Sequence, residues 1–108
     1  MKQGDVYWYD FRAPDKRRPV LILTRNSAIS YLTNVTVAQI TTTIRNAPSE
    51  VILTPDDDGT LEQCVMNAYN LFTVPKDRLT DLITELSPER MREVRAAVEF
   101  ALGLDALV

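Results

Sequence analysis

Pro19-Val20-Leu21-Ile22-Leu23-Thr24 is a continuous apolar run. A short run of this kind is typical of a strand that is buried on both faces of a sheet. The aromatic and β-branched run Val6-Tyr7-Trp8-Tyr9 precedes it, and such residues favour strands. With a period of two, Val6 and Trp8 share one face of that strand, and Tyr7 and Tyr9 share the other. The sequence therefore predicts neighbouring strands on both sides of a proline-containing loop.

More strands are predicted downstream. In Asn34–Thr41, Val, Val and Gln alternate with Thr, Ala and Ile, which is the pattern of a strand. Short β-prone runs follow at Glu50–Thr54, Gln63–Ala68 and Leu71–Val74. The intervening segment Pro55–Gly59 contains three aspartates but lacks the glutamate that closes an EF-hand loop. A solvated turn is therefore predicted there rather than a metal site.

The clearest helix signals lie near the C-terminus. Ser87 is a good N-cap, Pro88 suits the first helical position, and Gly103 marks the end of the helix. A shorter helix is predicted in Asn26–Leu32, which opens on N-cap residues. Residues 78–86 are compatible with either a helix or a strand. Many short strands followed by a long amphipathic helix predict a mainly β, α+β fold: a compact sheet or half-open barrel with a C-terminal helix.

The composition narrows the classes of function. The chain has 108 residues, 45% hydrophobic and 25% charged, which fits a single domain over residues 1–108. The absence of histidine excludes histidine-based triads, His-ligated zinc sites and His-based acid–base pairs. The single cysteine, Cys64, allows no internal disulfide, and the N-terminus lacks a signal-peptide pattern. No apolar run approaches the roughly 18 residues of a membrane span, so a cytoplasmic protein is expected.

The net charge of -3 hides an asymmetry along the chain. Residues 1–46 contain seven basic and three acidic residues, whereas residues 47–108 contain five basic and twelve acidic residues. The first segment therefore carries a net charge of +4, and the second carries -7. A basic segment of this kind suits a local anion site, and it suits a solvated charged face about equally well.

Four motifs occur in order along the sequence: Gly4–Trp8, Arg18–Leu23, Ile40-Thr41-Thr42, and Thr73–Lys76 followed by Arg78-Leu79. Together they resemble the MazF/PemK family of toxin endoribonucleases, and the resemblance covers nearly the whole chain. It implies a small SH3-like, barrel-like sheet with a C-terminal helix, which is the fold that this family shares with the gyrase poison CcdB. It also implies a homodimer and a cognate antitoxin whose acidic, disordered tail lies across the RNA site.

The resemblance further implies cleavage of single-stranded RNA at short sequences, without a metal or another cofactor. In that reaction the 2′-hydroxyl attacks the adjacent phosphate and leaves a cyclic phosphate and a 5′-hydroxyl. By resemblance, Arg18 and Thr41 carry the chemistry. The planar, permanently charged fork of an arginine stabilises negative charge on phosphoryl oxygens, and a threonine hydroxyl orients the phosphate.

The proton acceptor is the missing part of this site. Relatives carry a glutamate shortly before the arginine of the Arg-Pro motif, whereas this chain has Ala13 there, so Asp15 is the candidate base. Cys64 stands where relatives have a serine, and it is interpreted as a small buried residue rather than a nucleophile. Cations and polar groups suited to RNA are predicted at Arg12, Lys16, Arg17, Arg25, Thr42, Arg45, Asn67 and Asn70.

Two alternatives to RNA cleavage remain open. A CcdB-like toxin binds gyrase by protein contact and needs no active-site arginine. That type ends in a tryptophan-containing tail, whereas the only tryptophan here is Trp8. The second alternative is a degenerate family member that binds its antitoxin without cleaving RNA, and the missing loop glutamate keeps this alternative open.

Overall fold

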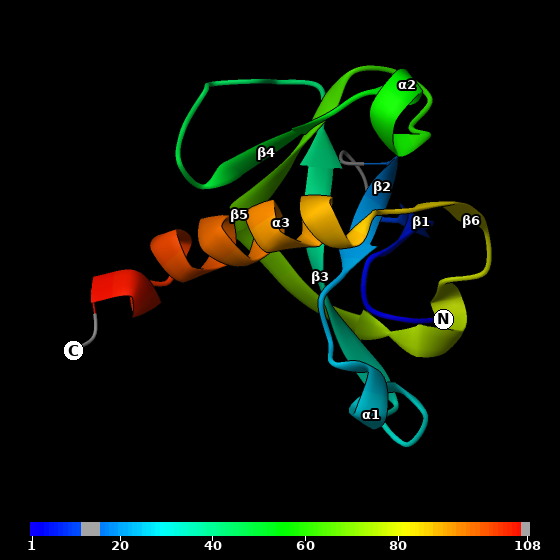
Figure 1. Cartoon of the computed structure of the whole chain (residues 1–108). Helices are drawn as coiled ribbons and strands as arrows, with labels where there is room; N and C mark the ends of the chain where they lie inside the picture. Colours follow the sequence, from blue (N-terminus) through cyan, green and yellow to red (C-terminus); the bar gives the residue numbers. More distant parts are fainter. Residues whose placement is uncertain (12–15, 107–108) are drawn as a thin grey trace.

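The computed structural model describes residues 1–11 and 16–106, which form an antiparallel sheet with helices around it (Figure 1). The strands are β1 (Asp5–Asp10), β2 (Arg17–Ile22), β3 (Asn34–Thr41), β4 (Glu50–Leu53), β5 (Cys64–Pro75) and β6 (Leu82–Glu85). The helices are α1 (Asn26–Ile29), α2 (Pro55–Asp58) and α3 (Pro88–Ala101), with short 3₁₀ turns at Lys76–Arg78 and Leu104–Ala106. Within these ranges the strand order is β4-β5-β3-β2-β1-β6. The predicted mainly β fold with a C-terminal helix is confirmed.

Helix α3 packs across one face of the sheet (Figure 1). Its buried residues Val94 and Ala97 join an apolar cluster with Leu21, Ala38 and Met66, which come from β2, β3 and β5. Alternate positions of the strands face the other way and form a second cluster, which includes Val20, Ile22, Val35, Val37 and Val74. The apolar run of β2 is therefore buried on both faces, as predicted.

The ends of α3 also follow their sequence signals. The Ser87 hydroxyl accepts a hydrogen bond from the backbone N–H of Arg90 at 3.1 Å, which caps the helix. Pro88 occupies the first helical position, where its missing N–H leaves no partner unsatisfied. Gly103 follows the helix with a φ of 73°, a left-handed conformation that favours glycine. The predicted start and end of this helix are confirmed.

Strand β5 is a single strand where the sequence predicts two. Ala38 of β3 lies opposite Leu71, whereas its neighbour Gln39 lies opposite Asn67, so the register shifts between them. The extra residues 68–70 form an irregularity that bends the strand without ending it. The prediction of two separate strands is wrong. The break in the β-prone pattern at residues 68–70 predicts a turn, but a bulge within one strand gives the same sequence pattern.

Residues 82–85 form the edge strand β6, which settles the choice that the sequence left open. β6 pairs with β1, and Asp5 lies opposite Glu85 while Val6 lies opposite Thr84. The ammonium of Lys2 also lies 2.8 Å from the Glu85 carboxylate. Backbone pairing with β1 outweighs the helical spacing of the leucines, because local propensity is a weak preference that tertiary contacts override.

The acidic segment after β4 agrees with the predicted solvated turn at its exposed residues Pro55, Asp56, Asp57 and Gly59, and departs from that prediction at Asp58. It forms α2, and the side chain of Asp58 is only 2% exposed. Asp58 accepts two hydrogen bonds from the guanidinium of Arg90 in α3, at 2.9 and 3.1 Å. Its carboxylate raises the pKa of Arg90 above the ordinary value. The prediction fails at this residue because the partner that allows burial of Asp58 lies far away in the sequence.

We expect Asp58→Ala to lower the free energy of unfolding by about 3 kcal/mol, because it leaves the Arg90 guanidinium without its main partner. Urea denaturation would measure this loss. Arg95→Ala is the matched control: it breaks an arginine–glutamate pair of the same helix whose side chains are 81% and 38% exposed. An exposed pair of this kind contributes less than about 0.5 kcal/mol. Equal losses in the two variants would contradict a stabilising role for the buried pair.

No helix in the described ranges is long and apolar enough to cross a membrane. The same residues contain no group of three or more His, Cys, Asp or Glu side chains that is arranged to hold a metal ion.

Candidate active site

Arg18 and Thr41 lie at the same end of the sheet. Arg18 is near the start of β2 and lies opposite Tyr9 of β1, and Thr41 is the last residue of β3. Val20 of β2 lies opposite Gln39 of β3, where the pairing of these strands ends, and Arg18 and Thr41 each lie two residues beyond that pair. Residues two positions apart on a strand share a face, and both residues line one pocket. The structure therefore brings together the two residues that the sequence assigns to the chemistry.

The guanidinium of Arg18 has an unused donor. Its Nε atom is buried and has no hydrogen-bond acceptor among the described residues. A buried, charged donor without an acceptor costs free energy. Arg18 is therefore a candidate contact for an anionic ligand.

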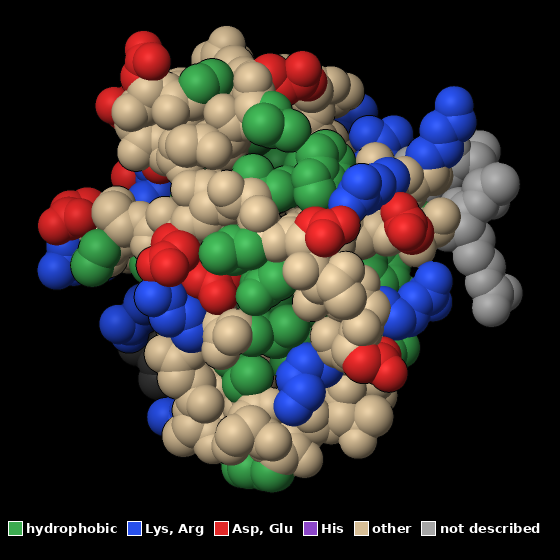
Figure 2. All heavy atoms as spheres, turned by 90° about the vertical axis from the view of Figure 1, so that its right-hand side faces the viewer, with side chains coloured by type: hydrophobic (Ala, Val, Ile, Leu, Met, Phe, Trp, Pro, Cys, Tyr) green, Lys and Arg blue, Asp and Glu red, His purple; other side chains and the backbone are tan. Residues whose placement is uncertain are grey.

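A pocket of about 240 Å³ opens beside this pair. Its lining residues Val6, Ile40, Cys64 and Ile83 belong to the apolar cluster that packs against α3, so the pocket lies on that face of the sheet, near the start of β2 and the end of β3. Its polar lining consists of Arg17, Arg18, Thr41, Thr42, Thr60 and Glu62, and its apolar lining of Val6, Trp8, Pro19, Ile40, Leu61, Cys64 and Ile83. Figure 2 shows apolar side chains along the middle of one side of the molecule, with basic and acidic side chains around them.

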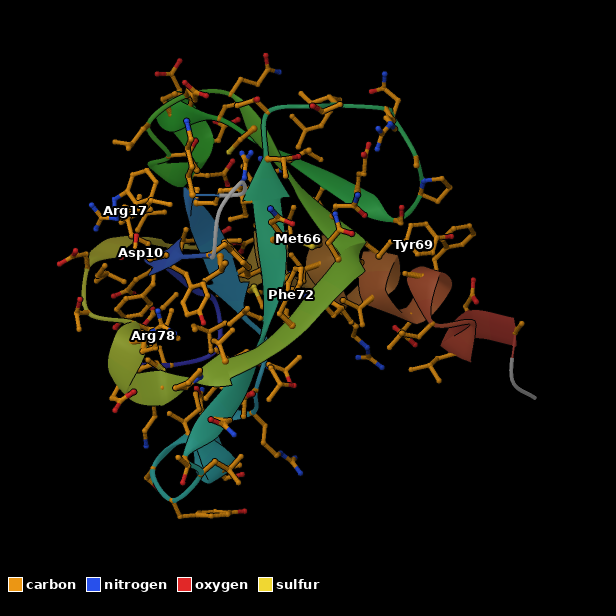
Figure 3. All side chains as sticks on the ribbon, turned by 180° about the vertical axis from the view of Figure 1, so that it is seen from behind. Asp10, Arg17, Met66, Tyr69, Phe72 and Arg78 are labelled. Carbon is orange, nitrogen blue, oxygen red and sulfur yellow. The ribbon has the colours of Figure 1, made fainter. Side chains whose placement is uncertain are left out.

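Arg17 is held by three neighbours. Its guanidinium pairs with Asp81 and lies 3.8 Å from the carboxylate of Asp10. It also lies 4.9 Å from the centre of the Trp8 ring, a cation–π arrangement. Asp10 and Arg17 are labelled at one edge of the sheet in Figure 3. Arg17 thus lines the pocket, but two carboxylates already pair with its guanidinium, which also packs against the indole of Trp8.

Glu62 is a pocket residue that the sequence analysis missed. It is the only acidic residue among the described residues that line the pocket. The Thr60 hydroxyl donates a hydrogen bond to the Glu62 carbonyl oxygen at 2.9 Å, and Thr60 is itself buried. This segment follows directly on Asp58, which Arg90 anchors. No local motif marks Glu62, because its position depends on α2 and on that long-range ion pair.

Besides Arg17, two predicted RNA-binding residues lie near Arg18 and Thr41. Thr42 lines the pocket. Asn67 lies on β5 opposite Gln39, one cross-strand pair along from Thr41 on the same face. Asn70 lies further along β5, in its irregular part.

Lys16, Arg25 and Arg45, the other predicted cations that the structure describes, do not line the pocket. Arg25 immediately precedes α1, at the opposite end of β2 from Arg18. Arg45 is exposed in the segment between β3 and β4, and Lys16 is exposed just before β2. Arg12 and the candidate base Asp15 lie outside the described residues.

The thiol of Cys64 is buried, as the sequence predicts: the residue is 6% exposed. Burial raises the pKa of the thiol, and a hydrogen bond with Thr60 partly opposes this rise. A raised pKa keeps the group as a thiol at neutral pH, and the thiolate is the reactive form.

We therefore expect the folded protein to react with iodoacetamide at neutral pH at least about tenfold more slowly than the same protein in urea. The rate of the folded protein should rise toward alkaline pH, because the raised pKa delays thiolate formation. Mass spectrometry of the alkylated chain would measure both rates. Equal rates for folded and unfolded protein would contradict the burial of the thiol.

Residues 2–102 match the family of PemK-like, MazF-like toxins of type II toxin-antitoxin systems. The chain belongs to this family. Among MazF relatives, it is 36% identical over 100 residues to the probable endoribonuclease MazF5 of Mycobacterium tuberculosis, covering 93% of this chain and 91% of that protein. It is 41% identical over 96 residues to endoribonuclease MazF3 of the same organism, and the match covers 87% of this chain and 90% of that protein.

Solved MazF structures have the same fold. A mycobacterial endoribonuclease in complex with its cognate antitoxin superposes with a TM-score of 0.85 at 34% identity, and the match covers 96% of each chain. The Mycobacterium tuberculosis toxin MazF-mt6 superposes with a TM-score of 0.82 at 34% identity, covering 92% of this chain and 96% of that one. These relatives confirm the predicted family, fold and endoribonuclease class, and they favour a nuclease over a CcdB-like gyrase poison.

Proposed function

We propose that this MazF/PemK toxin cleaves single-stranded RNA at the Arg18–Thr41 pair, by phosphoryl transfer that needs no metal. The observation that carries the proposal is the buried Nε of Arg18, which has no acceptor among the described residues and lies beside a pocket. A phosphate oxygen is the acceptor that such a donor suits, because the charged, planar guanidinium fits the geometry of a phosphate.

In the proposed reaction, the 2′-oxygen of one nucleotide attacks its own 3′-phosphate. The bond from phosphorus to the 5′-oxygen of the next nucleotide breaks, which leaves a cyclic phosphate and a 5′-hydroxyl. Negative charge grows on the non-bridging oxygens in the transition state, and the guanidinium of Arg18 stabilises it. The hydroxyl of Thr41 donates a hydrogen bond to the same phosphate and orients it.

Glu62 is the proposed proton acceptor for the 2′-hydroxyl. It is an exposed carboxylate that lines the same pocket as Arg18 and Thr41. A carboxylate can take the proton as general base, and the 5′-oxygen that leaves takes up a proton from water. In this assignment Glu62, from the segment after α2, supplies the base in place of Asp15.

The proposal includes a homodimer in the cytoplasm and a cognate antitoxin with an acidic tail. A relative of the same fold has been solved in complex with its cognate antitoxin, which supports this partner. Lys16, Arg25 and Arg45 are exposed and offer positive charge to such a tail. Arg17 contributes less, because Asp10 and Asp81 already pair with it.

The decisive experiment incubates the purified protein with a long RNA in EDTA and maps both kinds of new end. We expect cyclic-phosphate and 5′-hydroxyl ends at a small set of short sequences. Ends with a 5′-phosphate, or cleavage only after a divalent metal is restored, would overturn the mechanism. If no RNA is cleaved but the antitoxin binds, the chain is the degenerate family member that retains binding alone.

A further inference from the structure

A row of alternate side chains runs along β3 away from the proposed catalytic pair. Thr41, Gln39 and Val37 share one face of the strand, and each step of two residues advances about 6.6 Å. On the neighbouring strand β5, Thr41 lies opposite Val65 and Gln39 lies opposite Asn67. The Gln39–Asn67 pair is thus the first polar pair beyond the site of cleavage on this face.

The two amides of this pair have hydrogen-bonding capacity to spare. Both residues are half-buried. The Oδ1 atom of Asn67 accepts a hydrogen bond from the backbone N–H of Tyr69 at 3.0 Å, which fixes the orientation of the amide and leaves its Nδ2 donors without an acceptor among the described residues. None of the side-chain hydrogen bonds among the described residues involves the amide of Gln39. Donors and acceptors held in this way suit the edge of a nucleobase.

Glu50, the third residue of the cross-strand row that contains Gln39 and Asn67, already makes hydrogen bonds within the protein. Glu50 of β4 lies opposite Asn67, on the side away from Gln39. Its carboxylate accepts the backbone N–H groups of Arg45 and Ala47 at 3.0 and 3.1 Å. Glu50 therefore supports the loop after β3, and Gln39 and Asn67 remain as the groups of the row that are available to a ligand.

An aromatic side chain lies at the next step of the row. Phe72 lies opposite Val37 and is 39% exposed. Its ring lies 5.2 Å from that of Phe11, in an edge-to-face contact that limits its motion. Figure 3 shows Phe72 on the side of the sheet that faces away from α3. An exposed, fixed aromatic ring is the surface on which an unstacked base rests.

We propose that Gln39 and Asn67 read the base of a nucleotide next to the scissile phosphate, and that Phe72 stacks on the base beyond it. The inference rests on the proposed RNA cleavage and adds the residues that select its sequence. Charged contacts to phosphates bind every sequence alike, whereas neutral amides discriminate between base edges. The row therefore accounts for sequence selection within a site whose arginine recognises only the phosphate.

The test compares the cleavage-site profile of the wild-type protein with those of Gln39→Ala and Asn67→Ala on one long RNA. We expect each variant to lose about tenfold of its preference for one base at a fixed distance from the cut, because one hydrogen bond to that base is missing. Loss of stability slows all cuts equally and cannot change a base preference. Thr73→Ala, an exposed position of the same strand, is the matched control and should keep the wild-type profile.

An unchanged base preference in both amide variants would overturn the inference while leaving RNA cleavage intact. Phe72→Leu adds an independent measurement, since this face could instead be covered by a second copy of the chain. If Phe72→Leu changes the oligomeric state in light scattering and leaves cleavage unchanged, the ring is a subunit contact and its stacking role is wrong. If the wild-type protein cuts no RNA, the proposed function fails first, and this outcome is distinct from either of the others.

Discussion

Arg18→Ala is expected to lower the rate of RNA cleavage by at least about a hundredfold, because it removes the main positive charge at the proposed phosphate site. Its Nε has no internal acceptor among the described residues, so the substitution breaks no hydrogen bond there. The stability of the variant in urea should therefore stay close to that of the wild type. Single-turnover cleavage of a short RNA that contains one cut site would measure the rate.

Two further variants separate charge from geometry. Arg18→Lys keeps the charge but loses the planar fork, so its rate should lie between those of Arg18→Ala and the wild type. Arg92→Ala removes an exposed arginine of α3, outside the pocket beside Arg18, and should leave the rate unchanged. A loss smaller than about threefold in Arg18→Ala would be incompatible with the removal of a transition-state contact.

Glu62→Gln is expected to lower the cleavage rate at neutral pH by about a hundredfold, the usual effect of losing a general base. The amide has nearly the same shape as the carboxylate but cannot accept the proton of the 2′-hydroxyl. The affinity for RNA should stay close to that of the wild type, because the substitution affects the proton transfer and not the phosphate contacts. Single-turnover cleavage rates at saturating protein, with the dissociation constant of the RNA, would measure both quantities.

Two further variants test the assignment of Glu62. Glu89→Gln alters an exposed glutamate in the first turn of α3 and should leave the cleavage rate unchanged. Asp15→Asn tests the base suggested by the sequence. If Asp15→Asn lowers the cleavage rate by about a hundredfold and Glu62→Gln does not, the base is Asp15, and the role given to Glu62 is wrong.

Local patterns predicted those parts of the fold that depend on nearest neighbours. The alternation in Asn34–Thr41 matched the observed strand residue for residue, and Ser87 and Gly103 marked the ends of α3. The patterns failed where a distant partner decides the outcome. Burial of Asp58 requires Arg90. The bulge in β5 is set by its pairing with β3, where Gln39 lies opposite Asn67 while the preceding Ala38 lies opposite Leu71.

The candidate site likewise contains residues that the sequence predicted and residues whose place depends on distant parts of the chain. The resemblance to the family supplied Arg18 and Thr41, and the structure places both of them in the lining of one pocket. Charge alone also suggested Arg17 and Arg25, but it gives no information on position. In the structure, Arg17 is paired with carboxylates from β1 and from the segment before β6, and Arg25 lies at the far end of its strand. Glu62 had no sequence signal, because it reaches the pocket only through the fold.

The position of Trp8 also has a spectroscopic consequence. It is the only tryptophan of the chain, it lines the pocket beside Arg18, and its ring lies against the guanidinium of Arg17. The intrinsic tryptophan emission of the protein therefore originates from a single point on the pocket wall. RNA or antitoxin that enters the pocket, or displaces Arg17 from the indole, would alter that emission in an unlabelled protein. Binding should therefore be measured by a second method in the same titration. If the ligand binds and the tryptophan emission does not change, the ligand does not contact the part of the pocket that Trp8 lines.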